Sequence, residues 1–542
     1  MTPRLLPLAL CLLLGSCGGS SGTPAPGPGV AVYPAVTAPA RDPDLHAFEP
    51  FNYDDTTYPN GLSGQEGGFG FAHPWNDADG DVTDRVIGGN ALGVASDMAP
   101  PSSGGRSIHW GTTSTAIFRD LDRTYGEDGT TTWVSFRWIS TDATASEQLQ
   151  VVDFNDATGG FGCLVGQLRG LAGDDLDDGM YDLGDHASGT SADLAIRDQA
   201  IHFVLLRFRH GVGDVDGVDC WWDPTLATFA AGTPDASVAV SDASFSRITL
   251  RSTGADSLDE LYIGSTLEAV TTPAQRLAVY RIGNSLTWDS QPEGIEALAG
   301  QAGFMHDEGF HINCGNILAN IVAAPAQVCI PPVAEYGTWD VALPGTRWDA
   351  VTMQPFYGGS STLGSDEEAI LTLIDATRVN ADNADTRFYV YAAWPQRPTF
   401  AATWTAPVAD DDDTPTVLAR EYFTHLMTRV RAKTDATVYL IPVGEVLYDL
   451  DRRLQAGDVP GLTSIAQLYR DDIHLSYDLG RFVAGLTTYA TLFATDPTGI
   501  AKPERWYGAS AAPFTTAFHA AVNAAVWSVV SAHPHSGVTA TP

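Results

Sequence analysis

Hydrophobic and polar residues follow two different patterns along the chain, and the change falls near residue 270. Between about residues 46 and 270, short stretches of alternating apolar and polar residues are separated by Gly, Asp and Ser turns, and helical periodicity is nearly absent. In residues 133–139 every second position is apolar, as in a strand with one buried face. This half predicts an all-β sandwich. Its other predicted strands cover residues 150–154, 161–168, 201–208, 237–240, 248–251 and 260–263.

After residue 275 the pattern changes to continuous apolar runs, which are typical of strands buried in a parallel sheet. Amphipathic segments with helical spacing lie between them, which predicts a three-layer, doubly wound α/β domain. Ser365 and Glu368 form a capping-box pattern before one such helix. The expected strands are residues 277–282, 308–313, 350–353, 388–391 and 438–441. The expected helices are residues 366–378, 417–433, 479–493 and 514–530, with another beginning at 294.

The amino terminus carries a secretory pattern. Arg4 is followed by an apolar run at residues 5–14, which is too short to span a bilayer. The sequence Leu14-Gly15-Ser16-Cys17 resembles a bacterial lipobox. This resemblance implies lipidation of Cys17 and a place in the bacterial cell envelope, either periplasmic or at the cell surface. An ordinary secretory signal with an incidental Cys17 is the alternative.

The patterns divide the 542 residues into segments, since the chain is too long for one ordinary core. Residues 1–17 form the predicted signal peptide, and residues 18–44 a flexible tether of Gly, Ser and Pro. The β-sandwich takes residues 45–270, a linker residues 271–275, the α/β domain residues 276–533 and a tail residues 534–542.

Acidic residues outnumber basic ones by 66 to 29, and the net charge is −37. A surface of this sign repels nucleic acid and anionic lipid, so neither is an expected partner. Clustered carboxylates at residues 76–81, 174–178 and 214–219 are able to hold calcium, but none has EF-hand spacing. We interpret them as solvated loops and expect no metal site.

Six cysteines are present, and Cys11 and Cys17 belong to the amino-terminal segment. Outside the cytoplasm the other four invite the disulfides Cys163–Cys220 and Cys314–Cys329. Their wide spacing is not that of a zinc site.

Candidate chemistry begins in residues 281–289, RIGNSLTWD, between a predicted strand and a predicted helix. A serine at such a turn exposes its hydroxyl at the carboxyl edge of the sheet, and amides at the helix start can face a developing negative charge. Ser285 is therefore the candidate nucleophile; a turn without chemistry is the alternative. Downstream, His474 follows Asp471 by three residues. This spacing allows the carboxylate to orient an imidazole that reaches a distant serine.

Gly283-Asn284-Ser285-Leu286, followed late in the domain by Asp471-Asp472-Ile473-His474, resembles the SGNH, or GDSL-like, hydrolase superfamily. The resemblance implies a flavodoxin-like α/β domain and a serine hydrolase that needs no cofactor. It assigns Ser285 as the nucleophile, His474 as the general base and acid, and Asp471 as the orienting carboxylate. Asp472 is the adjacent alternative.

The same resemblance implies an oxyanion hole built from three donors. The first is the amide of Ser285, and by position the second is the amide of Gly315. No Gly-x-Asn-Asp block supplies the third donor; Gln354 stands there, with a side-chain amide one methylene longer than asparagine.

Four other residues lie near these motifs. His306 and His311 are rival bases, but neither has a carboxylate in the needed register, so we interpret them as structural or substrate-facing. We expect Trp288 and Asp289 to line the entrance, because they follow the nucleophile directly.

Residues 62–70, residues 202–208 with the following Trp-Trp-Asp-Pro, and residues 259–264 resemble concanavalin A-like, or LamG-like, jelly rolls. The resemblance implies carbohydrate binding by the sandwich. Exposed tryptophans suit sugar faces, but the tryptophans in strand-like runs fit a core better. They are Trp133, Trp138, Trp221 and Trp222.

Together with the patterns, the SGNH and lipobox resemblances imply a lipid-anchored, extracytoplasmic serine esterase that acts through an acyl-enzyme. An acetylated polysaccharide is the favoured substrate, by analogy. One alternative is a surface glycan-binding or adhesion lipoprotein with an inactive hydrolase domain. Another is a lipase or thioesterase of the same fold.

Overall fold

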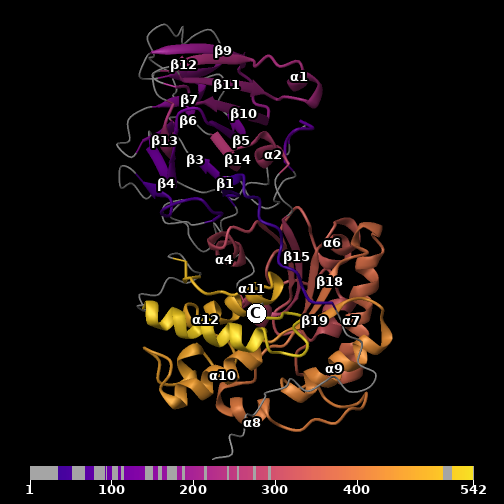
Figure 1. The fold of residues 1–542 in the computed structure, drawn as a ribbon. Helices are drawn as coiled ribbons and strands as arrows, with labels where there is room; N and C mark the ends of the chain where they lie inside the picture. The colour runs from indigo at the N-terminus through magenta and orange to yellow at the C-terminus, as the bar shows by residue number, and fades with distance from the viewer. Residues whose placement is uncertain are drawn as a thin grey trace, which may run out of the picture. The chain divides into compact units, whose positions relative to one another are not determined.

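The structure is a computed structural model that describes residues 34–51, 67–77, 92, 94, 96–100, 108–110, 115–140, 150–156, 162–167, 180–185, 189–212, 216–240, 243–252, 256–272, 276–290, 294–503 and 515–540. The predicted signal peptide, Cys17 and residues 174–178 lie outside these ranges. The described part of the chain contains two antiparallel sheets, one five-stranded parallel sheet and the helices packed on the parallel sheet (Figure 1). None of the helices in these ranges combines the length and the apolar character that crossing a membrane requires.

The two antiparallel sheets share one apolar core, so they form the predicted β-sandwich. Phe136 and Phe208 of one sheet and Phe154 and Ile248 of the other belong to this core. The first sheet has the order β1 (Leu45–Glu49), β14 (Asp256–Gly264), β5 (Thr131–Ser140), β10 (His202–Arg209), β11 (Asp216–Trp222) and β12 (Ala236–Val240), with β3 (Ile108–Trp110) also paired to β14. The second has the order β2 (Asn76–Asp77), β4 (Thr115–Tyr125), β13 (Phe245–Ser252), β6 (Gln150–Asn155), β7 (Cys163–Gln167), β8 (Met180–Asp185) and β9 (Thr190–Ile196).

The interpretation of residues 214–219 as a solvated loop is wrong from Asp216 onward. Asp216 begins β11, which lies between β10 and β12. Asp219 is buried there, and its carboxylate accepts hydrogen bonds from Arg207 and Arg209 on the neighbouring strand. Cross-strand arginines neutralise the carboxylate, which permits an acidic residue inside a sheet.

The tryptophans of the sandwich are packed rather than exposed, as expected for core residues. Trp138 and Trp221 are buried, and Trp133 and Trp222 are half-buried. Trp133 stacks on Trp221 with ring centroids 5.8 Å apart, and Trp138 meets Trp222 edge-on at 5.7 Å. These four rings therefore offer no open platform for a sugar.

Cys163 and Cys220 are free thiols in the sandwich core, so the disulfide predicted between them is absent. Burial raises the pKa of both thiols. Oxidation proceeds through the thiolate, so such a buried thiol is inert. Cys314 and Cys329 form the other predicted disulfide.

The parallel sheet contains the five strands that the sequence predicted. In spatial order they are β16 (His306–Ile312), β15 (Leu277–Gly283), β17 (Ala350–Met353), β18 (Arg387–Tyr391) and β19 (Val438–Ile441). This is the 2-1-3-4-5 order of a flavodoxin-like doubly wound sheet. The carboxyl end of β15 therefore lies where the strand order reverses, which is the usual place for a site in such sheets.

Helices cover both faces of the parallel sheet (Figure 1). The helix α11 (Leu479–Leu492) is buried on all sides from Gly480 to Leu492, so it lacks the exposed polar face of an amphipathic helix. One group of packed helices is α4 (Ile295–Gln301), α10 (Val443–Ala456), α11 (Leu479–Leu492) and α12 (Thr516–Val530). The other is α5 (Leu318–Ala323), α6 (Trp339–Gly345), α7 (Leu363–Arg378) and α9 (Arg420–Lys433).

Two helix predictions need correction. The capping box of α7 is formed by Thr362 and Ser365, three residues before the predicted pair. The helix α10 was not predicted, although Val443, Val446, Leu447 and later apolar residues repeat at helical spacing and are buried.

Candidate active site

The turn after β15 presents Ser285 at the start of the short helix α3 (Ser285–Trp288). Asn284 is the N-cap, and its side chain accepts a hydrogen bond of 3.0 Å from the N–H of Leu286. Position 283 has no room for a side chain, because a Cβ there would lie 2.0 Å from Oγ1 of Thr287. Glycine is therefore required at this position. The turn therefore places the Ser285 hydroxyl at the carboxyl end of β15.

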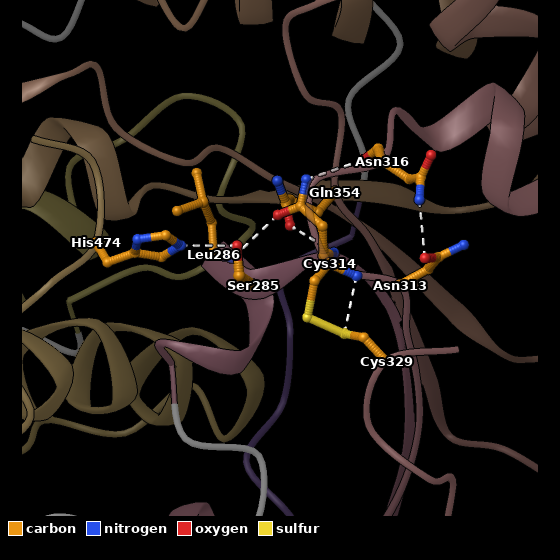
Figure 2. The surroundings of a disulfide bond; sticks show 9 residues. Ser285, Leu286, Asn313, Cys314, Asn316, Cys329, Gln354 and His474 are labelled. Atoms are coloured by element: carbon orange, nitrogen blue, oxygen red, sulfur yellow. Dashed lines mark hydrogen bonds between the residues drawn. A yellow bond between two sulfur atoms is a disulfide. The ribbon is translucent and has the colours of Figure 1, made fainter. Parts of the chain in front are cut away.

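Ser285, His474 and Asp471 form a continuous series of hydrogen bonds. Nε2 of His474 lies 2.9 Å from Oγ of Ser285 (Figure 2). Nδ1 of the same imidazole lies 2.8 Å from Oδ2 of Asp471. The three residues predicted as a catalytic triad thus lie in the order and at the distances that proton transfer requires.

The loop that carries Asp471 and His474 is held by hydrogen bonds to its backbone groups. Oδ1 of Asp471 accepts hydrogen bonds from the N–H groups of Ile473, at 2.8 Å, and His474, at 2.7 Å. The N–H of Arg470 donates to the carbonyl of His474 at 3.0 Å. Trp394, which follows β18, donates its indole N–H to the carbonyl of Ile473 at 2.7 Å.

These contacts fix the charge of Asp471. Partial burial acts to raise its pKa, but the N–H groups of His474 and Ile473 and the His474 imidazole outweigh burial and lower the pKa to about 2. Asp471 is therefore a carboxylate at neutral pH. An ionised acceptor beside Nδ1 favours the tautomer with a proton on Nδ1, which leaves the Nε2 lone pair facing Ser285.

Asp472, the alternative orienting residue, has a different partner. Its exposed carboxylate accepts a hydrogen bond of 2.7 Å from Arg397, and its carbonyl accepts the backbone N–H of the same arginine. Asp471 rather than Asp472 contacts the imidazole.

Two backbone N–H groups near Ser285 have no acceptor among the described residues. They belong to Ser285 itself and to Gly315, which follows β16 in a left-handed conformation with φ +69°. Asn284 joins the two segments by donating its side-chain amide to the carbonyl of Asn316 at 3.0 Å. These N–H groups are available to bind an anionic oxygen.

Gln354 has a contact pattern different from that of the predicted oxyanion donor. Its Oε1 accepts hydrogen bonds from the N–H of Asn284, the N–H of Thr287 and the hydroxyl of Thr287, at 3.1, 3.1 and 2.8 Å. Its Nε2 donates to the carbonyl of Pro355 at 3.3 Å. The side-chain oxygen of Gln354, not its nitrogen, contacts the turn that carries Ser285 (the nucleophile turn). Gln354 therefore stabilises the conformation of that turn.

The disulfide lies directly beside Gly315. Cys314 and Cys329, with Cα atoms 5.6 Å apart, close a loop across 15 positions, and the N–H of Cys314 donates to Sγ of Cys329 at 2.9 Å (Figure 2). An isolated β-bridge between Ile312 and Ile330 lies next to this link. The chain that leads into Gly315 is therefore fixed covalently to a second segment.

The remaining predicted residues lie elsewhere. His306 is buried and pairs with Glu308 at 2.7 Å, a carboxylate that its sequence position did not suggest. His311 is also buried, and burial lowers its pKa. Trp288 is half-buried against Phe310. Asp289 is fully buried, so the expectation that it lines the entrance is wrong.

No protein-family model matches the chain, and no curated protein matches it. Solved structures give similarities of low score. A DUF4886 family protein from Bacteroides uniformis has 19% identity and a TM-score of 0.34, with 47% of this chain and 95% of that chain covered. A carbohydrate esterase from the Shiga toxin-encoding bacteriophage phi24B has 9% identity and a TM-score of 0.23, with 41% and 98% covered. At these scores the similarities carry no argument about function.

The Gln354→Ala variant distinguishes a role of Gln354 in stabilising the nucleophile turn from a role as an oxyanion donor. It removes the acceptor of three buried donors, so the free energy of unfolding should fall by about 2–4 kcal/mol. Urea denaturation and ester hydrolysis on the same sample measure both effects. A variant with unchanged stability and a loss of kcat of about a hundredfold or more would instead indicate an oxyanion donor.

Replacement of Cys314 and Cys329 together by serine should lower the free energy of unfolding by about 3 kcal/mol, since a 15-residue loop loses its closure. It should also lower kcat, because Gly315 loses its anchor. Treatment of the wild type with a reductant should reproduce both effects. The same reductant should leave the double variant unchanged, because its remaining described cysteines are already thiols. Unchanged stability and kcat in the double variant would contradict this role.

Proposed function

We propose that the protein is a serine ester hydrolase of the SGNH type that forms an acyl-enzyme on Ser285. The observation that carries the proposal is the continuous series from Asp471 through His474 to Ser285, with distances of 2.8 and 2.9 Å. The N–H groups of Ser285 and Gly315, which have no acceptor among the described residues and lie in segments joined by the hydrogen bond from Asn284 to Asn316, support it further.

Acylation begins when Oγ of Ser285 attacks the ester carbonyl carbon and Nε2 of His474 takes the hydroxyl proton. The N–H groups of Ser285 and Gly315 donate to the oxygen that becomes negative. The carboxylate of Asp471 stabilises the imidazolium. The tetrahedral intermediate then expels the alcohol, which takes the proton from Nε2, and the acyl group stays on Oγ.

Deacylation repeats these steps with water. Nε2 of His474 takes a proton from the water as its oxygen attacks the acyl carbonyl, and the same two N–H groups bind the oxyanion. Collapse of the intermediate releases the carboxylic acid and returns the proton to Oγ of Ser285. No cofactor takes part in this cycle.

We extend the proposal to an acetylated polysaccharide as substrate and to a lipid-anchored protein of the bacterial cell envelope. The substrate class is supported by the resemblance of the β-sandwich to concanavalin A-like modules. The anchor is supported by the lipobox-like sequence that ends at Cys17.

A surface glycan-binding or adhesion protein is the second candidate. It is favoured by the contacts of Gln354, which leave two backbone donors where the SGNH pattern has three. Loss of one oxyanion donor slows catalysis by about a hundred- to a thousandfold without abolishing it. We therefore favour the enzyme.

Hydrolysis of p-nitrophenyl acetate tests the proposal. The wild type should hydrolyse it, and Ser285→Ala should not. Asp471→Asn should lower kcat by about 10⁴-fold, because the imidazole loses its orienting carboxylate. Asp472→Asn is the matched control and should retain most of the activity, since Asp472 pairs with Arg397.

Equal rates for the wild type and Ser285→Ala would contradict the enzyme and favour the binding protein. A series of p-nitrophenyl esters from acetate to palmitate separates the substrate classes. Preference for acetate supports the acetyl esterase, whereas preference for long chains indicates a lipase or thioesterase.

A further inference from the structure

The carboxylate of Asp289 accepts hydrogen bonds from the loop that carries His474 and from α11. Asp289 caps the C-terminus of α3, and its exposed fraction is 0%. Its Oδ2 accepts the backbone N–H of Leu475, the residue after His474, at 2.8 Å. Its Oδ1 accepts hydrogen bonds from Arg470 at 2.9 Å and from Arg481 at 2.8 Å.

The two arginines connect the same carboxylate to both ends of the histidine loop (residues 471–474). Arg470 precedes the Asp471–His474 turn and also donates to the carbonyl of Leu475. Arg481 lies in the first turn of α11, which follows the loop, and is almost fully buried. The ring of Tyr477 contacts both guanidinium groups, with centroid distances of 4.6 and 4.7 Å.

Such an arrangement requires an ionised Asp289. A buried carboxylate is stable only when charges and hydrogen bonds compensate its lost hydration, and here two guanidinium groups and one N–H do so. Conversely, removal of the negative charge would leave two arginines together with no counter-charge at that position. Asp289, the C-cap of α3, therefore helps to hold the histidine loop beside the turn that carries Ser285.

Two links consequently join the same pair of segments. Ser285 and Asp289 lie one turn apart, with the N–H of Asp289 bonded to the carbonyl of Ser285 at 3.0 Å. His474 and Leu475 are adjacent. The link between Ser285 and His474 must break during turnover, because an acylated Oγ has no proton to donate. The link between Asp289 and Leu475 involves no reacting atom and persists.

We propose that Asp289 is a positioning residue that keeps His474 in place over the acyl-enzyme, when the serine no longer holds it. This inference rests on the proposed function and extends it. Asp289 acts through His474 and touches no reacting atom. Its effect is therefore greatest on deacylation, where His474 must activate water without the hydrogen bond from Ser285.

The test is rapid-mixing kinetics of p-nitrophenyl acetate with Asp289→Asn. The amide keeps the size of the side chain and removes its charge. We expect deacylation to slow by about a hundredfold, the loss that a misplacement of about 1 Å causes. Acylation should slow less, so the variant should show a burst of p-nitrophenol of about one equivalent before slow turnover.

The matched control is Asp349→Asn. Asp349 also accepts a backbone N–H, from Ala278 at 2.9 Å, and an arginine, Arg347, at 3.0 Å. It lies at the amino ends of β15 and β17, whereas Ser285 lies at the carboxyl end of β15. Its loss should cost stability but leave the ratio of acylation to deacylation unchanged.

A second readout excludes a purely structural effect. In the His474→Ala background, Asp289→Asn should cause no further loss, because residues that act through one group are not additive. An equal fold-loss in both backgrounds would overturn the proposal, as would a deacylation rate within twofold of Asp349→Asn. If Asp289→Asn does not fold, Arg470→Met replaces it. Arg470 is partly exposed, and its loss should slow deacylation by about tenfold; no change would overturn the proposal.

The outcomes separate this inference from the proposed function. A wild type that hydrolyses no ester contradicts the proposed function itself. An active wild type with an unaffected Asp289→Asn contradicts only the role of Asp289.

Discussion

The hydrogen bond between Nε2 of His474 and Oγ of Ser285 joins residues 189 positions apart, and the other features of the site serve it. The bond forms only if the carboxyl end of β15 and the turn before α11 meet within hydrogen-bond distance. The parallel sheet makes this possible because β15 lies between β16 and β17, where the strand order reverses. Burial of the sheet and of α11 fixes the backbone, and local contacts then fix the three catalytic groups.

Each of the three segments of the site is stabilised by a different interaction. The nucleophile turn is held by the oxygen of Gln354, which accepts three hydrogen bonds. The segment of Gly315 is held by the disulfide between Cys314 and Cys329. The histidine loop is held by the carboxylate of Asp289. None of these contacts involves Oγ of Ser285 or the imidazole of His474, so the reacting side chains remain free to exchange protons.

The strands of the parallel sheet and the triad could be predicted because their signals are local. A continuous apolar run identifies a buried strand by itself, and His474 follows Asp471 by three positions in any fold. The strand β11 could not be predicted in this way, because Asp216 and Asp219 look like loop residues until Arg207 and Arg209 pair with Asp219 across strands. The helix α10 did carry a readable apolar repeat.

The contacts of Gln354, Asp289 and the sandwich cysteines depend on long-range packing. A glutamine amide carries a donor and an acceptor, and the sequence does not say which one meets the turn. An aspartate after a nucleophile resembles a surface residue until two arginines, 181 and 192 positions away, reach it. Cys163 and Cys220 lie on opposite sheets, and their thiols pack as apolar core groups.

If Ser285 is a nucleophile activated by His474, it reacts covalently with a reagent that traps such serines. The wild type is treated with an alkyl fluorophosphonate, and the intact mass and the modified peptide are measured. We expect one adduct, on Ser285, that is absent in Ser285→Ala and forms far more slowly in His474→Ala. No adduct, or labelling of Ser285 at the same rate without His474, would contradict it.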